Sequence, residues 1–148
     1  MGRPARLSRE AILTASIELL ESESAEAFTL ARVARKLDTV SMALYNYFPS
    51  REALLNAVAD DVCMRFEMPK IRSGQPWQKK LRAWLNAVRS LVEQRPVVLQ
   101  VLGVDGQTTA GWLRVSLHVS RTLHDEGMRG KELALNSYLF CSQVVALL

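Results

Sequence analysis

Apolar residues recur every three or four positions along most of this chain, which is the spacing of an amphipathic α-helix. No stretch alternates apolar and polar residues convincingly in the manner of a β-strand. The chain is therefore predicted to be all-α. The predicted helices cover residues 9–22, a short pair between Leu30 and Pro49, then 51–68, 77–94, 97–102, 109–126 and 131 to the end.

One segment clearly interrupts this pattern. Residues 68–76 hold two prolines and a glycine, a composition typical of a linker. A chain of 148 residues can form a small domain followed by a helical one. We therefore expect an N-terminal domain of residues 1–68 and a C-terminal domain of residues 69–148.

Residues 28–48 contain two short predicted helices joined by a tight turn. Ala34 is small where the two helices must approach each other, and Asp38 lies where the chain turns sharply. Such a turn favours a left-handed residue, a conformation that Asp tolerates better than most. The apolar seam between the helices comes from Val33, Leu37 and Leu44. In this geometry one helix can enter the DNA major groove while the other crosses the backbone.

Helix-start signals flank this unit. Ser8 is a predicted N-cap with Leu7 and Ile12 at the spacing of a hydrophobic staple, and Ser50 is a predicted N-cap of the next helix. With these flanks, roughly residues 8–58 resemble the N-terminal domain of the tetracycline-repressor (TetR) family without a gap. The resemblance implies a three-helix helix-turn-helix DNA-binding domain followed by a helical ligand-binding and dimerisation domain.

The chain departs from the family pattern at the turn. Family members usually have Gly where this chain has Asp38, and Val40 cannot cap the second helix of the pair. We therefore expect Thr39 or Ser41 to provide that cap.

The first residues of the second helix are the part that reaches base edges in this motif. They are Ser41, Met42 and Ala43. Ser41 can donate or accept a hydrogen bond, whereas Met42 and Ala43 offer only apolar contact, for example to a thymine methyl group. Thr29 combines a hydroxyl with the free N–H groups of a helix start, which suits a phosphate.

The resemblance implies further DNA contacts. Tyr45 and Tyr47 carry hydroxyls suited to phosphate oxygens, and Arg51 resembles the family's basic phosphate anchor. For Tyr45, packing between helices is the alternative, and for Leu44 and Phe48 core packing is the preferred interpretation. The predicted DNA-binding set, within a helix-turn-helix from Leu30 to Pro49, is Thr29, Arg32, Ser41, Met42, Ala43, Tyr45, Asn46, Tyr47 and Arg51.

The charge distribution limits what the net charge of +4 can say. Residues 1–68 hold eight basic and ten acidic residues, whereas residues 69–148 hold eleven and five. DNA binding must therefore depend on local placement, including Arg3, Arg6 and Arg9 near the start. No apolar run is long enough to span a bilayer and the first residues lack a signal-peptide stretch.

Cys63 and Cys141 lie inside apolar helical patterns, which favours buried, reduced thiols in a cytoplasmic protein. No metal-ligand spacing, phosphate loop, nucleophile elbow or paired carboxylates occur, so we expect neither an enzyme nor a cofactor.

For a ligand, the second domain offers Trp84, Trp112 and His118. For each of them taken singly, a place in the core is the preferred interpretation. The last predicted helix is still apolar at Leu148, whereas family members continue through one more helix. This indicates a truncated or reduced C-terminal domain.

These features predict a ligand-responsive repressor that binds a palindromic DNA operator as a homodimer. A small molecule in the second domain would change the separation of the two recognition helices. The alternative is a truncated or degenerate helical protein that dimerises or binds a partner without binding DNA.

Overall fold

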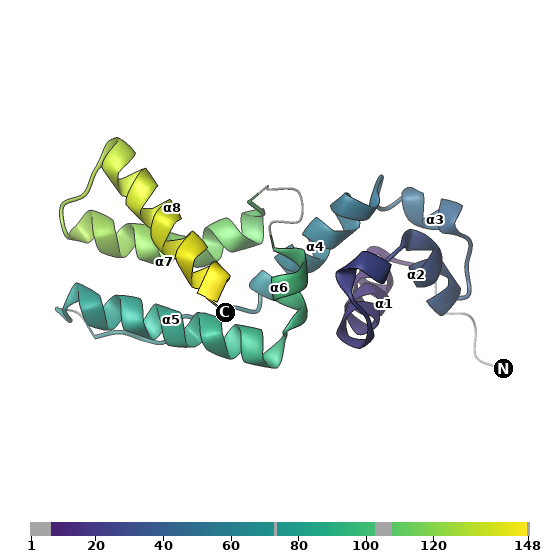
Figure 1. Ribbon diagram of the computed structural model, residues 1–148, viewed down its shortest axis with the longest axis horizontal. Coiled ribbons are helices and arrows are strands. Elements are labelled where there is room, and N and C mark those ends of the chain that lie inside the picture. Colours follow the sequence, from purple (N-terminus) through teal and green to yellow (C-terminus); the bar gives the residue numbers. More distant parts are fainter. Residues whose placement is uncertain (1–6, 73, 103–107, 148) are drawn as a thin grey trace.

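The computed structural model describes residues 7–72, 74–102 and 108–147, and these residues form eight α-helices, one 3-10 turn and no strand (Figure 1). The all-α prediction is confirmed. Residues 3, 6 and 148 lie outside the described part. The elements are α1 (Arg9–Ser22), η1 (Ala25–Ala27), α2 (Leu30–Lys36), α3 (Ser41–Tyr45), α4 (Arg51–Cys63), α5 (Trp77–Gln94), α6 (Val97–Val101), α7 (Ala110–Asp125) and α8 (Gly130–Leu147).

Helices α1 to α4 enclose an N-terminal core. Its fully buried members include Ile12, Leu20, Phe28, Val33, Leu44, Phe48 and Leu54. Ser8 caps α1 by accepting from the Ala11 N–H at 3.1 Å, and Ser50 caps α4 by accepting from the Ala53 N–H at 3.0 Å. Both predicted caps are confirmed, and Leu44 and Phe48 lie in the core as expected.

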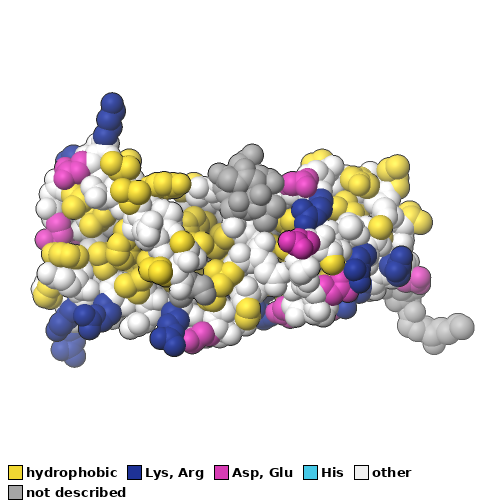
Figure 2. All heavy atoms as spheres, viewed as in Figure 1, with side chains coloured by type: hydrophobic (Ala, Val, Ile, Leu, Met, Phe, Trp, Pro, Cys, Tyr) yellow, Lys and Arg dark blue, Asp and Glu magenta, His cyan; other side chains and the backbone are white. Residues whose placement is uncertain are grey.

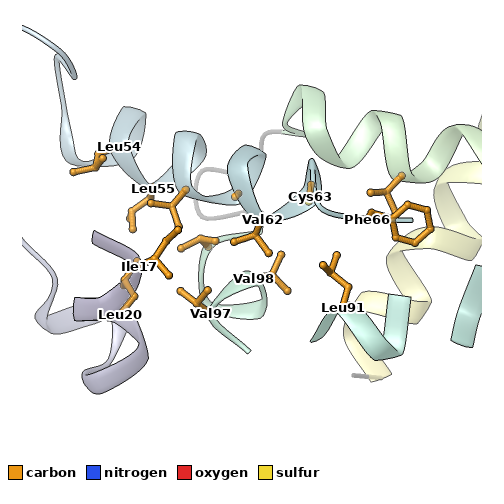
Figure 3. Close-up of a cluster of buried hydrophobic side chains, with 14 of the residues drawn as sticks. Ile17, Leu20, Leu54, Leu55, Val62, Cys63, Phe66, Leu91, Val97 and Val98 are labelled. Atoms are coloured by element: carbon orange, nitrogen blue, oxygen red, sulfur yellow. The ribbon is translucent and has the colours of Figure 1, made fainter. Parts of the chain in front are cut away.

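Helix α4 connects the two halves of the molecule because it is buried against both. It packs on α1 on the N-terminal side and on α6 and α7 on the C-terminal side. Figure 3 shows one continuous apolar cluster along it. The labelled members are Leu54, Leu55, Val62 and Cys63 of α4, Ile17 and Leu20 of α1, Val97 and Val98 of α6, and Phe66 and Leu91.

The sequence prediction was wrong about the end of α4. The helix was expected to reach Met68, but it ends at Cys63, and the Arg65 and Phe66 N–H groups donate to the carbonyls of Val62 and Cys63 in a tighter turn. Phe66 is buried there, with its ring 5.8 Å from the His118 ring of α7. This long-range packing ends the helix earlier than the local pattern indicates.

Helices α5, α7 and α8 form the C-terminal part and meet around Trp84. The Trp84 ring lies 6.3 Å from that of Trp112 on α7 and 5.8 Å from that of Phe140 on α8. None of the helices in the described ranges has the length and hydropathy needed to cross a membrane.

The turn between α2 and α3 is a Schellman motif, in which the chain leaves α2 through a left-handed residue. The Thr39 N–H donates to the Ala34 carbonyl at 2.9 Å, and the Asp38 N–H donates to the Arg35 carbonyl at 3.2 Å. Asp38 has φ 50°, so its predicted left-handed conformation is confirmed. Ala34, buried between the helices, lets them approach closely.

Gly111 lets α7 touch α4. A Cβ atom at this position would lie 2.8 Å from the Asp60 Oδ1 atom and 2.8 Å from the Cys63 Cβ atom. The Gly111 N–H instead donates to Asp60 Oδ1 at 2.5 Å, so a carboxylate of α4 holds the first turn of α7. Burial and the Asp60 charge raise the pKa of the Cys63 thiol to about 12, so this thiol stays protonated.

Asp38→Gly is expected to raise the free energy of unfolding by about 0.5–1 kcal/mol, because Gly adopts a left-handed conformation without steric cost. Asp38→Ala is the matched control, since it removes the same side chain but keeps the strain. Urea denaturation measures both variants. An Asp38→Gly protein no more stable than wild type would mean that the Asp side chain contributes more than the strain costs.

Gly111→Ala is expected to lower the free energy of unfolding by about 1–2 kcal/mol, because the clash with α4 outweighs the better helix propensity of Ala. The same denaturation measurement applies. Greater stability than wild type would show that α7 can move away from α4 at no cost.

Candidate nucleic-acid interface and ligand site

Helix α3 presents a distinct outer face. Leu44 points inward and is 0% exposed, whereas Met42 is 73% and Tyr45 48% exposed, and Asn46 is exposed beside them. The spacing of residues 42, 45 and 46 places these three on one side of a helix. Figure 2 shows hydrophobic side chains gathered over this end of the molecule. Tyr45 therefore does not pack between helices, which was its alternative.

The start of α3 differs from expectation. Val40 is the N-cap residue and no side chain caps the helix, so the predicted cap by Thr39 or Ser41 was wrong. The backbone instead closes the first turn, since the Ala43 N–H donates to the Val40 carbonyl at 3.0 Å. Val40 is 68% exposed and extends the apolar part of the outer face.

Ser41 and Ala43 are only half-buried neighbours of this face. Ser41 lines an open hollow of about 580 Å³ beside the turn, together with Arg35 and Asp38. Arg35 is exposed in the last turn of α2, and sequence analysis did not select it. Its position next to the entry of α3 makes it a further candidate for contact with a DNA phosphate.

Contacts of Tyr47 and Arg9 hold the start of α1 against the residues that follow α3. The Tyr47 hydroxyl donates to the Leu7 carbonyl at 2.9 Å. The Arg9 guanidinium lies 4.4 Å from the centre of the Phe48 ring. Tyr47 is still exposed at the surface, so its hydroxyl group can also accept a hydrogen bond or rotate toward a bound DNA molecule.

Arg51 is engaged by the protein itself. Its Nε atom donates to the Phe28 carbonyl at 3.0 Å and its Nη2 atom to the Ala25 carbonyl at 2.5 Å. It thereby ties the first turn of α4 to η1. The structure thus gives Arg51 a structural role that the sequence did not indicate, and its role as a phosphate anchor stays a prediction.

The start of α2 is also internally paired. Thr29 is the N-cap, its hydroxyl oxygen accepting from the Arg32 N–H at 3.3 Å. The Arg32 guanidinium forms an ion pair with Glu23, and Lys36 pairs with Glu18 at 3.0 Å. Both pairs are partly exposed to solvent, with Glu23 the most buried of the four side chains, so solvent screening limits the stability that each pair contributes.

The three predicted ligand residues do not line one site. Trp84 is 1% exposed, and its Nε1–H donates to the Val115 carbonyl at 2.8 Å, so its one polar group is already used. Trp112 is half-buried against it. His118, on another side of α7, faces Phe66 instead.

The pKa of His118 is lowered, mainly by burial and further by the charges of Arg121 and Arg114. The imidazole is therefore neutral near pH 7 and can both donate and accept a hydrogen bond.

An open groove of about 460 Å³ lies between the segment after α4 and α5. Phe66 and Glu67 line one wall, and a polar row at four-residue spacing on α5, formed by Asn86, Ser90 and Gln94, lines the other. The sequence analysis did not identify this groove, although the four-residue spacing of these polar side chains could have indicated it. Within the described ranges, no cluster of three metal-ligating side chains occurs.

Comparison with known proteins gives consistent matches. Residues 12–58 match the family model described as bacterial regulatory proteins, tetR family. The chain is 30% identical over 104 residues to the HTH-type transcriptional repressor DrrR1 of Streptomyces coeruleorubidus, a match that covers 67% of this chain and 38% of DrrR1. It therefore spans about two fifths of that relative's length.

Two solved structures share the fold. ActR of Streptomyces coelicolor in complex with actinorhodin is 21% identical with a TM-score of 0.81, over 96% of this chain and 68% of ActR. BioQ with its double-stranded DNA operator is 19% identical with a TM-score of 0.79, over 96% of this chain and 86% of BioQ. The family model covers residues 12–58, which include the helix-turn-helix of α2 and α3, so this N-terminal domain belongs to the tetR family of bacterial regulatory proteins, and the two solved structures share the fold along both parts of the chain.

Proposed function

We propose that this chain is a transcriptional regulator, a ligand-responsive repressor that binds a palindromic DNA operator as a homodimer. The observation that carries the proposal is the geometry of α3. This helix follows a Schellman turn, its inner residue Leu44 is fully buried, and its outer face is exposed. Such a rigidly held, outward-facing helix suits insertion into the major groove. Operator DNA would be met in the cytoplasm.

Effector control would act through α4. This helix carries the DNA-binding unit at one end and accepts the Gly111 N–H of α7 at the other. A ligand that shifts α7 relative to α5 would therefore move α4, provided that it binds the two arrangements with different affinity. We place the effector in the groove beside Phe66, whose ring faces His118, whereas Trp84 and Trp112 pack on each other and would support the site as packing residues.

An interface between copies would lie on the C-terminal helices. Several large apolar side chains are exposed there, and hydrophobic side chains gather over this part in Figure 2. They are Leu113 and Leu117 of α7 and Leu135, Tyr138 and Leu139 of α8. Contiguous exposed apolar surface of this kind is typical of an interaction site. With this surface paired by a second copy, two recognition helices would face one palindrome.

The alternative is a helical protein that dimerises or binds a partner without binding DNA. The ion pairs of Arg32 and Lys36 with acidic neighbours favour it, because they partly neutralise the basic side chains of α2. Measurement of sequence-selective, salt-dependent DNA binding separates the two functions.

Removal of a phosphate contact is expected to weaken binding to all duplexes alike. Arg35→Ala should reduce the slope of log affinity against log salt by about one. Tyr47→Phe should also weaken binding to all duplexes equally, but without a change in the salt-dependence slope. Fluorescence anisotropy at several salt concentrations measures both effects. Arg89→Ala, an exposed and ion-paired arginine of α5, is the control and should change neither. Loss of affinity for one sequence only would contradict the phosphate assignment.

Dimerisation is expected to depend on the face of α8. Tyr138 is 66% exposed, and Tyr138→Lys should raise the dimer dissociation constant by about tenfold or more, because a charge would be buried in an apolar contact. Sedimentation velocity across a concentration series measures it, with Tyr45→Lys on α3 as the control. A wild-type chain that stays monomeric at every concentration would contradict the interface.

A further inference from the structure

The outer face of α3 is unusual in its chemistry. Two strongly exposed side chains at its start are apolar, namely Met42 at 73% and the N-cap residue Val40 at 68%. Neither can donate or accept a strong hydrogen bond through its side chain. A base pair that faces them can be recognised only by the shape and apolar surface of its edge.

The same face lacks the side chains that read guanine. Residues 41–45 contain no Arg or Lys, and bidentate contact from these residues is the commonest way to select guanine in the major groove. Of the basic residues of α2, Arg32 is paired with Glu23 and Lys36 with Glu18. The third, Arg35, is assigned to a DNA phosphate under the proposed function rather than to a base edge. Ser41 is turned partly into the hollow beside Arg35.

We infer that Val40 and Met42 recognise the C5-methyl groups of pyrimidines, so that each operator half-site must carry thymine under the start of α3. This inference rests on the proposed function. The major-groove edge of thymine differs from that of cytosine by its methyl group and by an O4 acceptor in place of an N4 donor. Because Val40 and Met42 use only the methyl, 5-methylcytosine would serve in place of thymine.

The expected size of the effect follows from apolar burial. Removal of one methyl group from contact with an apolar side chain lowers affinity by about fourfold. In a dimer on a symmetric operator, the loss of the equivalent methyl group in both half-sites would multiply to about tenfold or more.

The experiment starts from duplexes selected by the full 148-residue chain from a random library. Each thymine of the selected half-site is replaced in turn by deoxyuridine, which removes the methyl group and nothing else. We expect about a fourfold loss of affinity at one or two adjacent positions per half-site. At those positions, 5-methylcytosine·guanine should bind about fourfold more tightly than cytosine·guanine.

Substitutions at Met42 test whether the outer face of α3 is responsible for this discrimination between thymine and deoxyuridine. Met42→Ala should bind the thymine and deoxyuridine duplexes equally at one of these positions, whereas Met42→Leu should keep the discrimination. Met64→Ala is the matched control, because Met64 is similarly exposed but lies at the far end of α4, and it should discriminate as wild type does.

Equal affinity of the wild-type chain for thymine and deoxyuridine at every position, with sequence-selective binding intact, would overturn this inference and leave the proposed function standing. A selected half-site with guanine and unmethylated cytosine under α3 would do the same. Failure to select any sequence would overturn the proposed function and the inference together.

Discussion

The burial of α4 on two sides is the constraint on which the rest of the molecule depends. Its apolar side chains at Leu54, Leu55, Val58 and Val62 are fully inaccessible, shared between α1 on one side and α6 and α7 on the other. A helix held in this way cannot shift relative to one half without disturbing its packing against the other. The orientation of α3 is therefore coupled to the C-terminal helices by close packing rather than by a flexible linker.

The Asp60 carboxylate adds a specific hydrogen bond to this coupling between α4 and α7. It satisfies the Gly111 N–H, one of the donors that the first turn of α7 leaves free, while Thr109 satisfies the Trp112 N–H. Gly111 is required because any larger residue would press against the backbone of Asp60 and the side chain of Cys63. The contact thus fixes both the distance and the axial register between α4 and α7.

Much of the architecture could be predicted from local sequence. The bounds of α1 and α5, the caps at Ser8 and Ser50, and the left-handed Asp38 follow from periodicity, side-chain hydrogen bonding and backbone sterics within a few residues. These determinants do not require knowledge of the fold, and the predictions from them are confirmed.

The remainder depends on contacts between distant segments. Arg51 binds carbonyls of η1, Phe66 leaves the helical path to pack on His118, and the Trp84 N–H is satisfied by Val115. None of these partners is close in sequence. From the sequence alone, Arg51 therefore reads as a phosphate anchor, Phe66 as part of a longer helix and Trp84 as a ligand-binding residue. The domain boundary at residues 68–69 stays a prediction, because the apolar cluster along α4 includes residues from both sides of it.

Under the proposed function, the paired charges around α2 and the apolar side chains of α3 would both increase the dependence of DNA affinity on sequence. Glu18 and Glu23 neutralise Lys36 and Arg32 in the free protein, and a phosphate that binds either cation must first replace a carboxylate. This exchange lowers the affinity that any DNA sequence would receive from electrostatics alone. Under the proposed function, the apolar part of the outer face of α3 would be exposed to water until a complementary base edge covers it, so its contribution would depend on the sequence that is bound. A weak general attraction combined with a sequence-dependent apolar contact favours discrimination over tight non-specific binding.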